Sequence, residues 1–153
     1  SGVYAHAPLV SFAAMSGSTL PRHRAITIAL SIWLVNQIIG FTFRDYPLTG
    51  TAFMWGLLMG IGTLLTVIWA SLRPTFSRIS WSGHFSWEII SIVVGFVLYQ
   101  GLISLAYPLM ADGHTMSWDI VVSIFGKQVM WASAISLGYA ALLWRQMTWL
   151  SPT

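Results

Sequence analysis

The sequence lacks cysteine and has few charged residues. Charged side chains make up 7 % of its 153 residues, whereas soluble domains carry roughly 25 %. The absence of cysteine excludes disulfides, thiolate metal sites and dithiol redox chemistry. With 56 % hydrophobic residues, the chain has too little polar surface to fold in water. We therefore expect an integral membrane protein.

Four apolar runs are each long enough to cross a membrane, which takes about 20 helical residues. They cover residues 25–43, 52–72, 87–107 and 117–144. These runs predict an all-α fold in which residues 21–150 form a four-helix transmembrane bundle. Residues 1–20 hold too short an apolar run to span and lack the basic region of a signal peptide. We expect them to form an extended or interfacial arm.

The basic residues lie between the apolar runs, an arrangement typical of topology signals and not of a nucleic-acid-binding patch. Five of them fall on one side of a four-span arrangement: Arg22, Arg24, Arg73, Arg78 and Arg145. The opposite side has Arg44, which Asp45 offsets. The pattern predicts two antiparallel hairpins with both termini cytoplasmic, and we expect the membrane to be the bacterial inner membrane.

The third and fourth runs open with similar triplets, Ser86-Trp87-Glu88 and Ser117-Trp118-Asp119. A serine can cap free N–H groups at a helix start, and a carboxylate there is favoured by the helix dipole. We therefore expect Glu88 and Asp119 to mark helix starts near opposite membrane faces. That placement would prevent them from acting as an acid/base pair.

Small residues are spaced by four in the second run, where Gly56 and Gly60 are followed one turn later by Thr63. Such spacing lets two helix backbones approach closely, and packing is a main source of association energy in lipid. These three residues are the predicted helix-packing face.

A few polar side chains interrupt the apolar runs. They are Asn36, Gln37, Gln100, Lys127 and Gln128. Lys127 is the most unusual, because a lysine deep in the bilayer costs on the order of 3 kcal/mol on insertion scales. Its flexible stem can carry the ammonium toward the depth of Gln100 and Asn36. We predict that it points into protein and that the five side chains form one polar cluster in the outer half of the membrane.

A weak internal repeat relates two segments that lie 61 positions apart. Gly40 with Tyr46-Pro47 recurs as Gly101 with Tyr107-Pro108. Two hairpins in the same orientation would form a parallel repeat of the kind that some transporters use. The match covers few positions and is equally compatible with chance.

The sequence shows no pattern typical of catalysis. It has no nucleophile elbow, phosphate-binding loop or zincin motif. Its four histidines, His6, His23, His84 and His114, are expected in arms or loops, which disfavours axial ligation of haem or chlorophyll within a span. His114 with Asp112 could contact a metal at the interface, although a solvated loop is the simpler interpretation. We expect neither an enzyme nor a dedicated metal site.

Two classes of function remain. The first is a non-catalytic subunit or assembly factor of a larger membrane complex, with the glycine face and Lys127 used for helix–helix contacts, either within the bundle or with a partner. The alternative is a small transporter or channel component with the polar cluster lining its route. We favour the subunit, because four helices enclose little space.

The expected partners are membrane lipid and other membrane subunits or further copies of the chain. No cofactor is identified, but an apolar ligand such as a lipid, quinone or carotenoid needs no signature residues.

Overall fold

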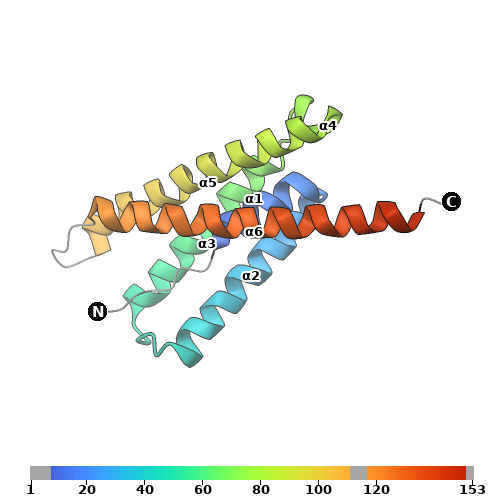
Figure 1. The fold of residues 1–153 in the computed structure, drawn as a ribbon. Helices are drawn as coiled ribbons and strands as arrows, with labels where there is room; N and C mark the ends of the chain where they lie inside the picture. The colour runs from blue at the N-terminus through green and yellow to red at the C-terminus, as the bar shows by residue number, and fades with distance from the viewer. Residues whose placement is uncertain (1–7, 111–116, 151–153) are drawn as a thin grey trace.

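The structure is a computed structural model that describes residues 8–110 and 117–150. Over these ranges it consists of six helices and contains no strand (Figure 1). In chain order they are α1 (Leu9–Thr19), α2 (Arg22–Phe43), α3 (Gly50–Ala70), α4 (Phe76–Ile79), α5 (Trp81–Met110) and α6 (Trp118–Leu150). The prediction of an all-helical fold is confirmed.

Four of these helices are long and apolar enough to cross a membrane. Their qualifying stretches are Arg22–Phe43, Gly50–Ala70, Trp81–Leu109 and Val121–Arg145. The shortest has 21 residues, which at about 1.5 Å per residue matches a hydrocarbon core of about 30 Å. The prediction of four helices with the length and composition of membrane spans is confirmed, with boundaries that differ by a few residues.

One boundary difference changes the surroundings of a predicted residue: α5 begins at Trp81 and not near Trp87. Ser80 has an extended backbone, and its hydroxyl oxygen accepts a hydrogen bond from the Gly83 N–H at 3.0 Å. Ser80 is therefore the helix cap. Ser86 lies within the helix and donates to the Ser82 carbonyl oxygen at 2.8 Å. The predicted helix start at residues 86–88 is wrong, and Glu88 lies inside the helix.

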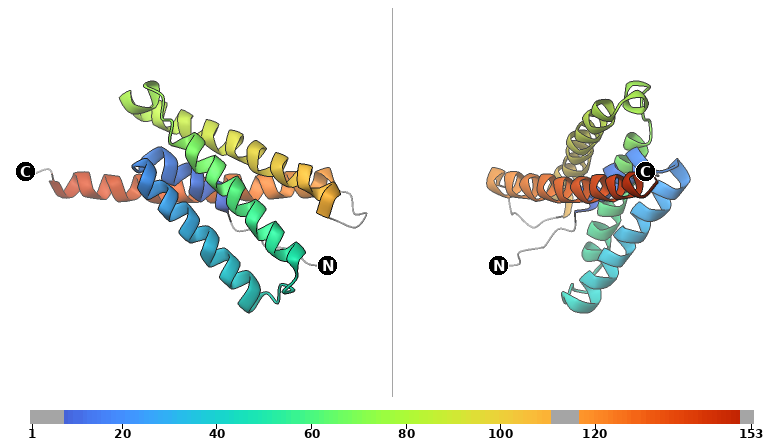
Figure 2. Two further views of the ribbon diagram at one scale, coloured as in Figure 1. Left: turned by 180° about the vertical axis from the view of Figure 1, so that it is seen from behind. Right: turned by 45° about the vertical axis from the view of Figure 1, so that its right-hand side comes forward.

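Helix α1 is the most deeply buried element. Figures 1 and 2 show it in the middle of the molecule, where it contacts α2, α3, α5 and α6. The prediction of an extended or interfacial arm is therefore wrong for Leu9–Thr19, and residues 1–7 lie outside the described part. The physical reason is the size of its side chains. Alanine, serine and glycine make this helix thin enough to fit between longer helices, although 11 residues are too few to span.

The two ends of α1 are held by side chains from distant parts of the chain. The Leu20 carbonyl oxygen, just past its C-terminus, accepts a hydrogen bond from Arg73 Nη2 at 2.7 Å. Near its N-terminus, the Ser11 N–H donates to Gln128 Oε1 at 3.4 Å. Both bonds satisfy backbone groups at a helix end, which have no partner within the helix itself.

Helix α3 contacts α1, α2 and α5, whereas α6 packs against α1 and α5. In Figures 1 and 2, α6 runs past these helices and its C-terminal part reaches beyond them. Only 17 % of the residues in its apolar stretch are buried. Most of the surface of α6 is therefore available to lipid or to another protein.

The two copies of the weak sequence repeat have different surroundings. The Tyr46 N–H donates to the Gly40 carbonyl oxygen at 3.2 Å, and the Tyr46 ring packs against that glycine. Gly101 instead has open space beside its α-carbon, and Tyr107 stays within α5 and packs against Trp55. The similarity in sequence is not reproduced as a structural repeat.

Candidate functional site

The predicted packing face of α3 lies against α2. Gly56 and Gly60 are buried, and a Cβ atom added at Gly60 would lie 2.8 Å from Trp33 Cε2. One added at Gly56 would lie 2.7 Å from Gln37 Oε1. Trp33 Nε1 also donates to the Gly56 carbonyl oxygen at 2.8 Å. The two glycines therefore admit bulky α2 side chains within the same chain. Thr63 is buried too, and its hydroxyl donates to the Met59 carbonyl oxygen.

A second close contact joins α3 to α5, and the sequence analysis missed it. A Cβ atom at Gly62 would lie 2.6 Å from Tyr99 Cδ2, and one at Gly95 would overlap Thr66 Cγ2. The Tyr99 side chain of α5 thus packs on Gly62 of α3, and the Thr66 side chain of α3 packs on Gly95 of α5. Glycines on two sides of α3 explain how it packs against two helices at once.

The five predicted polar residues have different surroundings. Gln37 lies at the α2–α3 contact, where its Nε2 is buried without a hydrogen-bond partner. Gln128 lies on α6 and accepts from the Ser11 hydroxyl at its backbone carbonyl and at Oε1, at 2.7 Å and 3.0 Å. Gln100 is buried on α5, and Asn36 is half-buried on α2. The contacts of Gln37 and Gln128 thus belong to different helix pairs.

Lys127 is exposed on α6 and does not point into the described part of its own chain, so the prediction that it points into protein now requires a partner. Gln128, the next residue, is only 3 % exposed. Successive side chains point about 100° apart around a helix axis. Gln128 can therefore face the bundle while Lys127 faces outward. Within the described residues, the Lys127 ammonium makes no hydrogen bond and no ion pair.

One side of α6, which we call the Lys127 face, is exposed along several turns. It consists of Ser123, Lys127, Met130, Ala134, Gly138 and Ala141. These positions recur at intervals of three or four and therefore lie on one side of the helix. A Cβ atom added at Gly138 would find no atom within 4 Å. The Lys127 face thus combines one cation with small residues and an open surface.

The opposite side of α6 carries a polar contact with α5. Glu88 is 3 % exposed as a residue, and its carboxyl is hydrogen-bonded to the Ser136 hydroxyl. His84 lies one helical turn before Glu88 and interacts electrostatically with it. One further turn into the bundle, Ile92 packs with Ala132 of α6 in a small apolar cluster. A carboxyl group is therefore enclosed between the two helices.

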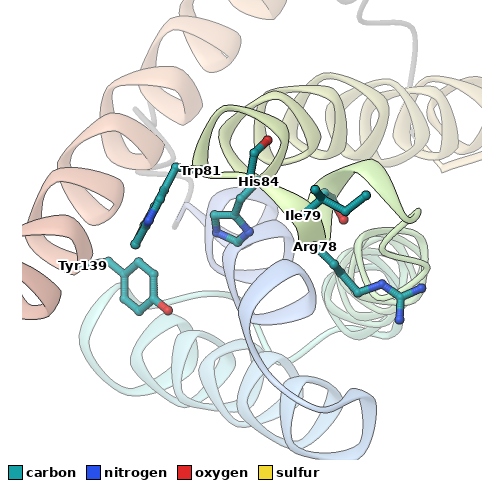
Figure 3. Close-up of a pocket in the computed structure, with 7 residues that line it drawn as sticks. Arg78, Ile79, Trp81, His84 and Tyr139 are labelled. Atoms are coloured by element: carbon teal, nitrogen blue, oxygen red, sulfur yellow. The ribbon is translucent and has the colours of Figure 1, made fainter.

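A pocket of about 290 Å³ opens next to this contact. Its lining comes from α4, the start of α5 and α6, and comprises Ser77, Arg78, Ile79, Ser80, Trp81, His84 and Tyr139. In Figure 3 the His84 and Tyr139 rings lie on the pocket side, whereas the Arg78 guanidinium points away from Tyr139. His84 Nε2 is buried and has no hydrogen-bond partner. The pocket thus exposes a histidine and a phenol one turn from the Glu88–Ser136 pair.

This contact could not be predicted while the third apolar run was expected to begin at residue 87, because α5 begins at Trp81. His84 was expected in a loop but lies in α5, and His23 lies in α2. His6 and His114, as well as Asp112, are outside the described residues. The available signal was Ser80, which can cap a helix that begins at Trp81. From that start, His84 and Glu88 are spaced by four and share one side of the helix.

Comparisons with protein families, with characterised proteins and with solved structures found no match. In the described ranges, no three histidine, aspartate or glutamate residues lie close enough to hold a metal ion.

Proposed function

We propose that the protein is a non-catalytic subunit or assembly factor of a membrane protein complex, and that its Lys127 face binds a transmembrane helix of a partner subunit. The observation that carries the proposal is the exposure of Lys127 on an apolar helix, without a polar partner in the described part of its own chain. A partner helix that offers a carboxylate or another acceptor at this depth would supply the hydrogen-bond partner that the Lys127 ammonium lacks.

The energetic argument concerns the depth of Lys127. It lies nine positions after Trp118, the first residue of α6, which corresponds to about 14 Å along the helix. A charged side chain at the bilayer centre costs about 3 kcal/mol on insertion scales, and a long stem lowers this cost by carrying the charge toward the interface. An acceptor in a neighbouring helix lowers it further and gives the contact its specificity.

The neighbours of Lys127 suit a close helix contact. Ala134, Gly138 and Ala141 continue the same side of α6 toward its C-terminus, and small residues let two backbones approach. The glycine face of α3 is not available for this role, because side chains of α2 occupy it. The partner contact predicted from the sequence is therefore assigned to α6 and not to Gly56 and Gly60.

We also propose that the spans form two antiparallel hairpins with both termini cytoplasmic, in the bacterial inner membrane. The arginine distribution supports this orientation. The hydrogen bond from Arg73 to Leu20 supports the first hairpin, because it joins the segment after α3 to the segment before α2. Those two segments must then lie on the same side of the membrane.

The proposal is tested by purifying the protein from its native membrane in a mild detergent and measuring its native mass and the polypeptides that accompany it. We expect a partner polypeptide. Lys127→Met should reduce its recovery about tenfold or more, because the change strands the partner's acceptor at a cost above about 1.4 kcal/mol. Lys127→Arg should retain the partner at least partly. Val129→Ala, on an exposed position outside the Lys127 face, is the matched control.

Two results would contradict the proposal. If Lys127→Met retains the partner as well as the parent does, Lys127 reaches the lipid headgroups and is not a subunit contact. If the parent purifies alone or as a homo-oligomer, the subunit assignment is wrong, and a homo-oligomer would favour the transporter.

A further inference from the structure

The Ser136 hydroxyl has more contacts than it has hydrogen atoms. Its oxygen lies 2.7 Å from the Ala132 carbonyl oxygen and is also hydrogen-bonded to the Glu88 carboxyl. A hydroxyl has one hydrogen and two acceptor lone pairs. If that hydrogen is donated to Ala132, the bond to Glu88 requires a hydrogen from the carboxyl. A protonated Glu88 gives each contact its own hydrogen, whereas a carboxylate would have to share the Ser136 hydrogen with the Ala132 carbonyl oxygen.

Burial of Glu88 favours the same state, because it disfavours the charged carboxylate. His84 on α5 is the titratable group that acts on it electrostatically, and α6 contributes Ser136 and, one turn on, Tyr139. From α1, Met15 reaches Ser136 at 3.6 Å and carries no charge. Arg78 of α4 lines the pocket but points away from Tyr139 (Figure 3). An unpaired carboxylate enclosed in such surroundings would be costly.

We infer that Glu88 is a proton-binding site inside the membrane-spanning bundle, and that it exchanges its proton with water in the pocket through His84. This site lies on the side of α6 opposite to the Lys127 face, so the inference does not depend on the proposed partner.

His84 is the residue placed to connect Glu88 with the pocket. It lines the pocket, lies one helical turn from Glu88 and has a buried Nε2 without a hydrogen-bond partner. Uptake involves one proton and no electrons. A hydronium ion in the pocket gives a proton to the neutral imidazole and becomes water, and the imidazolium passes that proton to the Glu88 carboxylate and becomes neutral again. Release follows the same steps in reverse.

The path ends at Glu88. Beyond it, Ile92 of α5, Ala132 of α6 and Ala14 of α1 form a buried apolar cluster. None of these side chains can carry a proton. Glu88 therefore exchanges with one side of the membrane only, which makes it a binding site and not a transmembrane proton channel.

The test is infrared spectroscopy of the full-length protein in liposomes, between about pH 5 and pH 8, where histidine exchanges protons. The sequence has only four acidic residues, so a carboxylic-acid C=O band can be assigned by substitution. We expect a band that disappears in Glu88→Gln, persists in Asp119→Asn and shifts to higher frequency in Ser136→Ala. Asp119 is exposed on α6 and is the matched control.

The route is tested by transfer into heavy water. The wild-type band should shift on deuteration, and His84→Gln should slow that shift at least tenfold while retaining the band. Circular dichroism and thermal melting establish that each variant is folded. Absence of the band from folded wild-type protein across the pH range would overturn the proton site. A band that never exchanges, or one that exchanges as fast in folded His84→Gln, would overturn the route through His84.

Discussion

At the scale of single residues, one helical position separates two different roles on α6. Gln128 is buried and hydrogen-bonded to Ser11 of α1, whereas Lys127 is exposed. The sequence indicates that both residues interrupt an apolar run, but it does not indicate which of them faces the rest of the chain. That choice depends on α1, whose serine lies 117 positions away.

The Gln128–Ser11 contact yields a prediction about stability. Gln128→Leu should lower the free energy of unfolding by about 1–3 kcal/mol, because it leaves the buried Ser11 N–H and hydroxyl without the Gln128 side chain as a partner. Thermal melting in a mild detergent measures the change. Ser133→Ala is the control, because the Ser133 hydroxyl is exposed and donates to the backbone of its own helix. Equal losses in both variants would show that the interhelical bond contributes nothing.

The Glu88 site also depends on a residue-scale detail, the position of one serine cap. Because Ser80 caps α5, Glu88 lies seven residues after the first residue of the helix and not at its start. The hydroxyl that contacts it is on α6. No local pattern predicts that pairing, because it requires the packing of two helices whose contacting residues are far apart in the sequence.

At the scale of whole elements, the four long helices could be predicted and the short one could not. Each of the four apolar runs, such as residues 25–43, is longer than a buried strand or loop would be. Their length alone therefore identifies them as helices that can span a membrane. Helix α1 has no such length. Its burial results from small side chains at positions such as Ala13, Ala14 and Gly17, and the same composition also occurs in surface loops.

The contact between α2 and α3 gives a prediction at this scale. Gly60→Leu should destabilise the protein by about 1–3 kcal/mol, because its side chain would overlap the Trp33 indole. Thermal melting is again the measurement. Gly101→Leu is the control, because nothing lies within 4 Å of a Cβ atom at that position. If both variants melt at the parent's temperature, α2 does not pack on the glycines of α3.

At the scale of the whole molecule, the testable property is topology. Single cysteines at Leu48 and Thr75 occupy exposed positions in the two connections that flank α3. An impermeant thiol reagent added to intact cells should label Leu48→Cys and leave Thr75→Cys unlabelled, because the arginines favour the cytoplasmic side for the second connection. Labelling after cell disruption controls for accessibility. The reverse pattern in intact cells would invert the proposed orientation.

The central position of α1 also has a consequence for biosynthesis. Helix α1 precedes the long helices in the chain, yet its surroundings include α5 and α6, which leave the ribosome later. Domains generally fold from the N-terminus as they are synthesised, but this helix cannot complete its contacts until α6 has been inserted. We therefore expect α1 to remain accessible to chaperones or proteases during translation and to dock in one of the last steps of folding.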